Sequence, residues 1–298
     1  MNNWTRDTID AKENWYHPLP QICRDISAKI NTPDILSCRL GSHDLLACRQ
    51  ALQSTAFDLE NGRGFAIVRL PDYPLDPACA SLLYWIVGQG LGLPFMQNVQ
   101  GALLYDVRDT GQDVAQGARF SVTNYDSSYH TDNSFGLEIL DYVGLLCLQV
   151  AKSGGLSQIV SGHSALEELK KNHAEDLAIL KQPFPFDRRG GLKEGDSPTI
   201  AFPVIQEQGE LLFRYLRYWI EVGQEKSGQP LTPAQVHALD TLDRVLNLPE
   251  LRVEFDLQPG DMYFINNRWT LHNRTAFQDH ETPEKKRHLL RLWLRRPL

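Results

Sequence analysis

Residues 287–295, RHLLRLWLR, form the stretch that decides the fold class. Side chains of a β-strand alternate between two faces, and the even-numbered positions of this stretch are mainly apolar. The opposite face carries, in order, Arg287, Leu289, Arg291, Trp293 and Arg295. A solvated sheet edge would explain the arginines, but the leucine and tryptophan between them favour the wall of a pocket. Because a buried arginine needs an anionic partner, this strand predicts an anion-binding cavity.

The rest of the chain adds many short strands and a few helices. Apolar or alternating runs predict further strands at 64–70, 101–107, 141–150, 156–162, 210–216, 250–257 and 261–265. Capping residues and helical spacing predict helices at 43–60, from 76 to about 87, at 164–180 and at 233–247. This pattern predicts a mainly β protein with flanking helices, built as a jelly-roll barrel rather than as a parallel α/β sheet.

The 298 residues are predicted to form a single catalytic domain, 1–298. Residues 1–60 are expected to form an N-terminal arm and helix packed on the barrel. Residues 106–128 and 182–200 are polar and contain glycine, and loops of that length in a compact domain are often lids. Arg188 and Arg189 lie in the second loop, where a solvated charged surface is favoured over contact with an acidic substrate.

Composition narrows the class of protein. The chain is 42% hydrophobic and 22% charged with a net charge of −7, which is typical of a soluble globular protein. The acidic balance argues against a nucleic-acid or membrane-surface partner. No membrane span or signal peptide is predicted, and five cysteines without a Cys-x-x-Cys pair indicate free thiols in the cytoplasm. A small-molecule partner is expected, and a homo-oligomer is left open.

Two His-x-acid triplets occur, and their contexts differ. His173 and Glu175 lie within the predicted helix 164–180, where positions i and i+2 point apart and cannot chelate one ion. His130 and Asp132 lie in a stretch rich in serine, asparagine and aromatic residues without helical spacing. If that stretch is extended, both side chains project from the same face. The spacing therefore suits a metal site.

His272, which follows an apolar strand, is the candidate third ligand. Two histidines and one carboxylate can hold a ferrous ion on one face and leave the opposite face open. The same residue types also make a catalytic zinc site, which would need a general base. Glu138, eight residues after His130, is not placed convincingly for that role. A non-catalytic metal- or ligand-binding barrel is the other alternative, and it would need no anion-binding arginine.

From about residue 60 to the end, the chain resembles the taurine dioxygenase and clavaminate synthase-like group. The motifs that follow the family order are His130 to Phe135, Gly154 to Ser157, Pro259 to Asp261, Asn267 to His272, and Arg287 with Arg291. Members are Fe(II)- and 2-oxoglutarate-dependent oxygenases with a double-stranded β-helix, a cupin-like jelly-roll barrel. The resemblance implies Fe(II), 2-oxoglutarate and O2 as cofactor and cosubstrates, with His130, Asp132 and His272 as the catalytic metal ligands.

The resemblance also implies roles for three residues outside the triad. Arg287 matches the arginine that binds the distal carboxylate of 2-oxoglutarate. Ser157 stands where many members have a threonine that hydrogen-bonds this cosubstrate, and it keeps the hydroxyl. Arg291 matches a position that often contacts the acidic group of the primary substrate. Four residues of strand separate the two arginines by roughly 13 Å, so they would serve different ligands or different ends of the cavity.

Four weaker candidates complete the predicted substrate pocket. Asn124, Tyr129 and Asn133 flank the first two metal ligands, and Arg217 lies in an arginine- and aromatic-rich segment. Arg291, together with Arg217 if it also faces the cavity, predicts a small substrate that carries a carboxylate or similar anion, such as an amino acid derivative. The expected reaction is hydroxylation of an unactivated C–H bond with release of succinate and CO2. Desaturation or cyclisation by the same oxidant and a non-catalytic cupin-like binding barrel are the alternatives.

Overall fold

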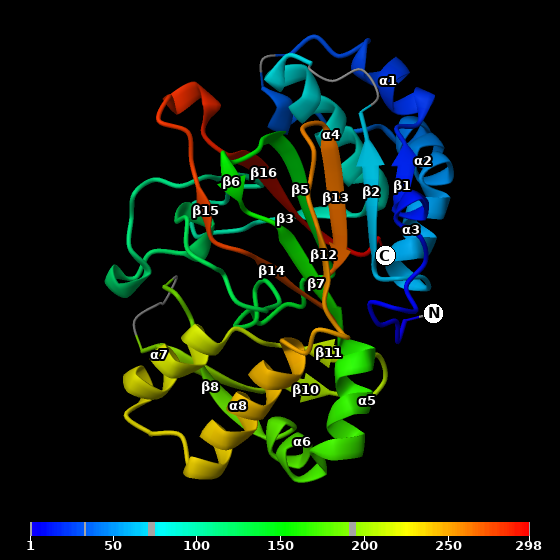
Figure 1. Ribbon diagram of the computed structural model, residues 1–298. Coiled ribbons are helices and arrows are strands. Elements are labelled where there is room, and N and C mark those ends of the chain that lie inside the picture. Colours follow the sequence, from blue (N-terminus) through cyan, green and yellow to red (C-terminus); the bar gives the residue numbers. More distant parts are fainter. Residues whose placement is uncertain (1, 33, 71–74, 191–194, 298) are drawn as a thin grey trace.

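The computed structural model of the protein describes residues 2–32, 34–70, 75–190 and 195–297, and its centre is a seven-stranded sheet (Figure 1). The strands are β1 (Tyr16–Pro18), β2 (Phe65–Arg69), β3 (Leu93–Phe95), β4 (Leu104–Val107), β5 (Tyr142–Gln149), β13 (Asp261–Asn266) and β16 (His288–Arg295). Their order is β1-β2-β13-β5-β16-β3, with β4 also paired to β16. Only the β1–β2 pair of this sheet is parallel, and the other pairs are antiparallel.

A second, three-stranded sheet faces the first. Its strands are β12 (Val253–Phe255), β7 (Ser157–Ser161) and β14 (Thr270–Arg274), with β7 in the middle and both pairs antiparallel. One apolar cluster draws its side chains from both sheets, among them Phe65, Ile67, Cys147, Ile159, Phe255, Tyr263 and Leu289. Two facing sheets around one apolar core form the jelly-roll that the strand pattern predicted.

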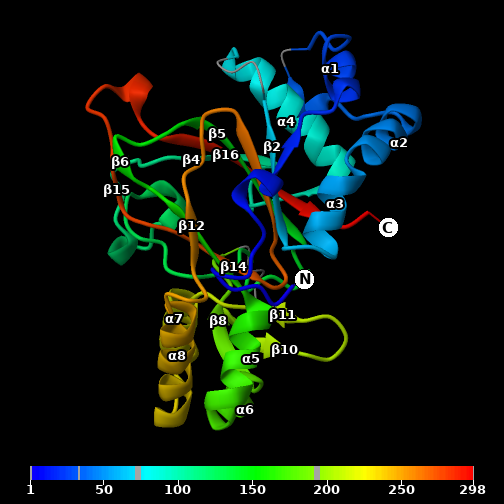
Figure 2. The ribbon, with the colours of Figure 1, turned by 45° about the vertical axis from the view of Figure 1, so that its right-hand side comes forward.

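Helices cover the outer face of the large sheet and the far side of the small one (Figures 1 and 2). The first group is α1 (Gln21–Ser27), α2 (Ser42–Ala51), α3 (Gln53–Glu60) and α4 (Pro77–Leu91). Leu290, Leu292 and Leu294 of β16 join the apolar cluster under these helices. A Cβ atom on Gly88 of α4 would lie 2.2 Å from Leu292 Cδ2, so glycine permits this close packing.

The second group forms a lower layer. Its helices are α5 (Gly162–Asn172), α6 (Ala174–Leu180), α7 (Arg217–Ser227) and α8 (Pro233–Leu246). The layer also contains two antiparallel strand pairs. One joins β8 (Pro183–Asp187) to β9 (Thr199–Pro203), and the other joins β10 (Ile205–Gln206) to β11 (Leu212–Phe213). Thr232 and Gln235 form the capping box predicted for α8. The remaining elements are β6 (Ser153–Gly154), β15 (Phe277–Gln278) and the 3-10 turns Lys12–Trp15, Ile35–Ser37, Val114–Gln116, Phe120–Val122 and Pro283–Lys285.

Two predicted helices are each broken in the structure. The helix expected at 43–60 is interrupted at Leu52, which is buried and packs against Gly90 of α4. The helix expected at 164–180 begins earlier, at Gly162, because the Ser161 hydroxyl caps it by accepting from Ser164 N, and it is interrupted at His173. The break at Leu52 serves tertiary packing that helical spacing alone does not encode.

Other predicted boundaries also need correction. The segment predicted as a loop at 182–200 contains strands β8 and β9. Residues 191–194, between these strands, lie outside the described residues. The strand predicted at 210–216 is reduced to β11, and helix α7, which follows it, was not predicted. Interleaved arginine and aromatic residues in that segment gave no clear helical period.

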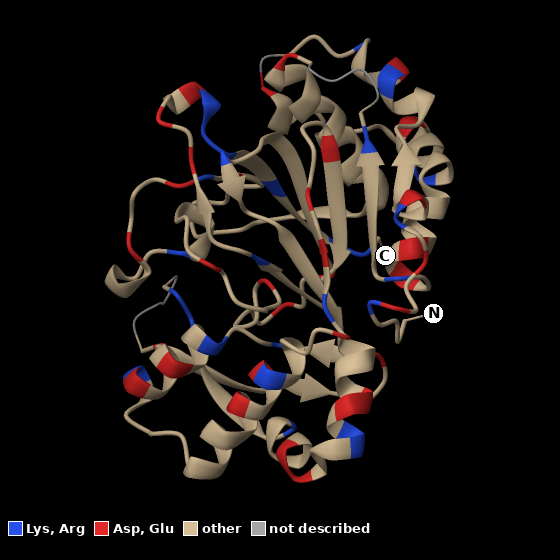
Figure 3. Ribbon diagram, in the orientation of Figure 1, with Lys and Arg blue, Asp and Glu red and all other residues tan. Residues whose placement is uncertain are grey.

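Surface and thiol features agree with the composition. All five cysteines are free, although Sγ of Cys23 lies 3.9 Å from Sγ of Cys48. Basic and acidic residues are interspersed along the helices (Figure 3). Within the described residues, no helix combines the length and apolar character needed to cross a membrane.

Leu292→Ala tests the packing between β16 and α4. Leu292 is 0% exposed, so we expect the free energy of unfolding to fall by about 2–5 kcal/mol, because a cavity replaces the side chain. Chemical denaturation followed by circular dichroism measures this change. The control is Leu46→Ala on α2, where the side chain is 58% exposed and a change within about 0.5 kcal/mol is expected. Equal losses in the two variants would contradict the assigned core.

Candidate metal centre

Backbone pairing brings the two predicted histidine ligands together. His130 N donates to His272 O and His272 N donates to His130 O, both at 3.0 Å. This exchange makes them directly opposed residues of an antiparallel bridge, so their side chains share a face. The ring centroids lie 4.4 Å apart. A residue of an irregular segment is thereby fixed against the sheet strand β14.

The predicted carboxylate ligand is held by a different set of bonds. Asp132 N donates to Asn267 Oδ1 at 2.7 Å, and Asn267 Nδ2 donates to Asp132 O at 2.9 Å. Thr131, between the two ligands, turns away: its hydroxyl donates to Phe213 O and accepts from Tyr215 N. The extended alternation predicted for His130 and Asp132 is therefore present.

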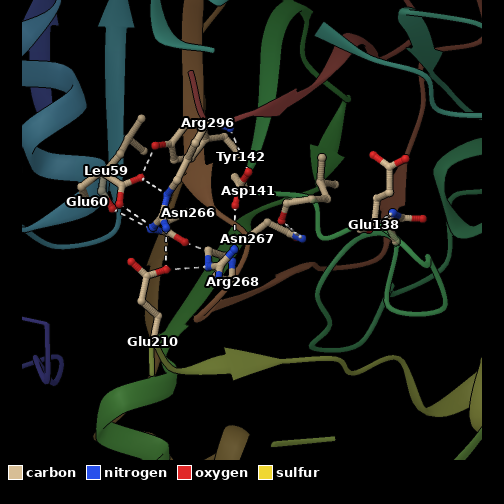
Figure 4. Close-up of polar contacts among 12 residues, drawn as sticks. Leu59, Glu60, Glu138, Asp141, Tyr142, Glu210, Asn266, Asn267, Arg268 and Arg296 are labelled. Atoms are coloured by element: carbon tan, nitrogen blue, oxygen red, sulfur yellow. Dashed lines mark hydrogen bonds and ion pairs between the residues drawn. The ribbon is translucent and has the colours of Figure 1, made fainter. Parts of the chain in front are cut away.

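The turn that contains Asn267 is itself fixed by an ionic network (Figure 4). Asn267 N donates to Asp141 O, and the neighbouring Arg268 binds Asp141 at 2.8 Å and Glu210 at 3.0 Å. Arg296 pairs with the same Glu210 carboxylate, and its backbone N–H donates to Asp141 Oδ2. Charges from four separated segments thus support the amide that positions Asp132.

The three side chains fit a metal ion. One ligand atom from each of His130, Asp132 and His272 lies within 4.8 Å of the others, and the described parts of the chain contain no second group of this kind. His130 Nδ1 donates to Ser128 O at 2.8 Å, which leaves the Nε2 lone pair free. The buried His272 Nδ1 has no hydrogen-bond partner among the described residues. Burial, with the adjacent His130, lowers the pKa of His272 to about 3, so the ring is neutral and able to ligate.

The Asp132 carboxylate is oriented by two donors. Its Oδ2 atom accepts from Arg291 Nη1 at 3.1 Å and from Trp293 Nε1 at 2.9 Å, while its Oδ1 atom lies 3.6 Å from His130 Nε2. Burial would raise the pKa of this carboxyl, but the Arg291 charge holds it well below its usual range. One oxygen is therefore left for a metal, which suits monodentate coordination.

A niche rich in arginine lies beside this centre. Arg287 is buried, and its Nη1 atom has no partner among the described residues. Arg274, two residues after His272 on β14, shares its face and sits directly opposite Ser157 of β7. Both guanidinium groups lie over the Phe277 ring, at 4.7 Å for Arg274 and 5.1 Å for Arg287. Burial lowers the pKa of Arg287 to about 10 and, with the Arg287 charge, that of Arg274 to about 9.

These features fit the distal carboxylate of a keto acid. A Cβ atom on Gly155 would lie 3.4 Å from Arg287 Nε, so glycine keeps space next to this group. Arg287 is buried and Arg274 is partly buried, and neither forms an ion pair with a carboxylate among the described residues, so the two charges favour binding of an anion. Arg287 and Ser157, the two residues predicted to contact the cosubstrate, both neighbour Arg274: Arg287 lies over the same Phe277 ring, and Ser157 is its strand partner. Arg274 itself was not predicted, although it lies two residues after the predicted ligand His272.

A cavity opens over the metal centre. Its lining side chains include Arg119, Phe120, His130, Asp132, Asn133, Phe135, Arg189, Leu216, Trp219, His272, Arg274, Arg291 and Trp293. Of the predicted substrate residues, Asn133 and Arg291 line it. Arg189, for which a solvated loop was favoured, lines it as well, so that interpretation is corrected.

Three other predicted substrate residues do not line the cavity. Tyr129 is buried in the apolar cluster of the lower layer, because alternation turns it away from the face of its neighbour His130. Arg217 binds the carboxylates of Glu221, Asp240 and Asp243 at 2.7, 2.9 and 3.1 Å. The peptide of Asn124 accepts a hydrogen bond from Phe277 N. For these three residues the predicted substrate contact is not supported by the structure.

Comparisons with known proteins agree with this site. The family model described as taurine catabolism dioxygenase TauD, TfdA family, matches residues 43–293. FR-33289 synthase of Streptomyces rubellomurinus (strain ATCC 31215) is 32% identical over 304 residues, which cover 98% of this chain and 88% of that protein.

Two solved structures are similar across the whole fold. One is an asparagine oxygenase in complex with Fe(II), 2S,3S-3-hydroxyasparagine and succinate, with a TM-score of 0.68 and 19% identity over 94% of this chain and 93% of that one. The other is the non-heme iron oxygenase OrfP in complex with Fe and alpha-ketoglutaric acid, with a TM-score of 0.68 and 18% identity over 94% of this chain and 93% of that one. At this identity they show a shared fold.

Trp293→Phe tests the orientation of the carboxylate ligand. The change keeps an aromatic ring but removes the N–H that donates to Asp132 Oδ2, so we expect Fe(II) affinity to fall by about 10–100-fold. Anaerobic equilibrium dialysis measures the affinity. The matched control is Trp85→Phe, which removes a buried N–H bonded to Cys38 O, remote from the site. Unchanged Fe(II) affinity in Trp293→Phe would contradict this role.

Proposed function

Because the chain belongs to the taurine catabolism dioxygenase TauD/TfdA family of Fe(II)- and 2-oxoglutarate-dependent dioxygenases, we propose that it hydroxylates a small anionic substrate. The bond attacked is an unactivated C–H bond, and the substrate class is a carboxylate-bearing compound such as an amino acid derivative. The asparagine oxygenase of similar fold holds a hydroxylated amino acid, which is the type of product proposed for this chain.

The observation that carries the proposal is the pairing of a metal triad with an unbalanced buried cation. His130, Asp132 and His272 offer three ligand atoms within 4.8 Å, and Arg287 Nη1 is buried without a partner among the described residues. A zinc hydrolase would need the metal triad and a general base, but it would not need the buried arginine. Glu138, the candidate base, instead pairs with Arg295, and its side chain is 58% exposed.

In this proposal the protein binds iron and 2-oxoglutarate, orients the substrate, and excludes water from the reacting bond. The triad holds Fe(II), while Arg287, Arg274 and Ser157 hold 2-oxoglutarate by its distal carboxylate. Bound iron and 2-oxoglutarate together supply the oxidative chemistry that consumes O2 and releases succinate and CO2. The apolar side chains of the cavity keep water from the reacting C–H bond and fix its distance from the metal.

Arg291 acts in two ways in this proposal. Its Nη1 atom donates to Asp132 Oδ2, and its Nε donates to Gln97 Oε1 at 2.8 Å. The guanidinium also lines the cavity, where it would attract the carboxylate of the substrate. Hydroxylation is the simplest outcome for a substrate held in this way, because nothing beyond the C–H bond has to react.

Arg287→Ala tests the cosubstrate site. Loss of a buried charge partner costs about 2–5 kcal/mol, so we expect the KM for 2-oxoglutarate to rise on the order of a hundredfold, while Fe(II) affinity stays unchanged. The assay follows succinate formed from 2-oxoglutarate in the absence of a primary substrate. Arg295→Ala, on the same strand with its side chain 46% exposed, is the control and should change the KM less than about twofold. Equal effects of the two variants would refute the assignment.

A further inference from the structure

Two arginines from separate segments of the chain line the same cavity. Arg119 precedes the 3-10 turn Phe120–Val122, and Arg189 follows β8; both line the cavity above the metal centre. Arg189 Nη2 donates to Gly117 O at 3.2 Å, which ties its segment to the one that carries Arg119. Arg119 Nη1 donates to Gln97 O at 3.2 Å, and Gln97 Oε1 accepts from Arg291. The two guanidinium groups are therefore held by backbone carbonyls.

Their positive charge is poorly balanced. In the described residues no carboxylate lies within 4.0 Å of the Arg119 guanidinium, and Arg189 reaches only Asp187, at 3.9 Å. That carboxylate already binds Lys226 at 2.9 Å. The acidic group nearest the metal, Asp132, is committed to Arg291 at 3.1 Å. Carbonyl oxygens satisfy hydrogen bonds but carry no net charge, so this end of the cavity retains about two positive charges.

Both groups are also partly removed from water. The Arg189 side chain is 17% exposed, its guanidinium carbon lies 3.7 Å from the Trp219 ring centroid, and its buried Nε has no partner among the described residues. Burial lowers the pKa of Arg119 and that of Arg189, and the Arg119 charge lowers the latter further. A pair of desolvated, mutually repelling cations is costly unless a ligand neutralises it.

We propose that Arg119 and Arg189 form the binding site for a phosphorus oxyanion of the substrate, the –PO3 group of a phosphonate or a phosphate monoester. This inference rests on the proposed function and deepens it, because it names a second anionic group that the substrate carries. Such a group carries up to two negative charges and three acceptor oxygens. Two guanidinium forks from different directions match a tetrahedral dianion better than a planar carboxylate, which one fork satisfies.

Each anionic group of the ligands has its own arginines in this proposal. Arg287 and Arg274 serve the cosubstrate beside Phe277, and Arg291, bonded to Asp132, faces the substrate carboxylate. Arg119 and Arg189 remain for a second anionic group of the substrate, and Phe120 and Trp219 line the cavity with them. A substrate anchored there would extend its carbon chain along the apolar wall toward the iron.

The test compares two small probes that differ in charge but hardly in shape. Methylphosphonate and methanesulfonate are titrated by calorimetry, under anaerobic and mildly alkaline conditions, into protein loaded with Fe(II) and 2-oxoglutarate. Loading is first verified by equilibrium dialysis of both components. We expect methylphosphonate to bind at least about tenfold more tightly than methanesulfonate, because it carries the second charge. Arg119→Ala and Arg189→Ala should each weaken methylphosphonate binding at least about tenfold.

Arg188→Ala is the matched control. The guanidinium of Arg188, the residue before Arg189, pairs with Asp196 at 3.5 Å instead of lining the cavity, so its removal should leave the affinity unchanged. Arg119→Lys, which keeps the charge, should retain part of the binding if Arg119→Ala does not fold. Equal affinity for the two probes, or equal loss in Arg188→Ala and Arg189→Ala, would overturn the assignment. Failure of the protein to take up iron or 2-oxoglutarate would instead refute the proposed function.

Discussion

The antiparallel bridge between His130 and His272 is the constraint on which the site depends. Their two reciprocal hydrogen bonds of 3.0 Å attach an irregular segment to strand β14 and force both imidazoles onto one face. Alternation then brings Asp132 and Arg274 to that same face, each two residues further along its own segment. Asn267 fixes the Asp132 backbone from the other side, through bonds to both its N–H and its carbonyl. One bridge therefore sets the positions of the metal triad and of part of the cosubstrate niche.

Unbalanced positive charge is the second organising feature of this active site. Buried Arg287 and partly buried Arg274 lie over the same Phe277 ring, and Arg119 and Arg189 line the cavity over the metal centre. Stability alone does not favour such pairs, since desolvated like charges repel. Binding of anions makes these arginine pairs favourable. Their positions therefore indicate where the anionic groups of the ligands bind. Arg291 differs from these four, because it also pairs with the Asp132 carboxylate at 3.1 Å.

Much of the site followed from local sequence rules, and the exceptions have physical causes. The period-two pattern of residues 287–295 correctly separated the face of Leu292 from that of Arg291, and extended geometry correctly paired His130 with Asp132. The same alternation could have excluded Tyr129, the immediate neighbour of His130. Arg217 was assigned to the pocket because helix α7 was not recognised, and Arg119 and Arg189 could not be found because their segments have no period and are positioned by tertiary contacts.

The most direct measurement is an anaerobic titration of the metal-free protein with Fe(II) and then 2-oxoglutarate, followed by visible absorption. We expect a weak metal-to-ligand charge-transfer band that is absent in His272→Ala, because it requires the keto acid to chelate an iron held by the triad. Folded, iron-loaded protein that shows no band after addition of 2-oxoglutarate would contradict the assignment of this site.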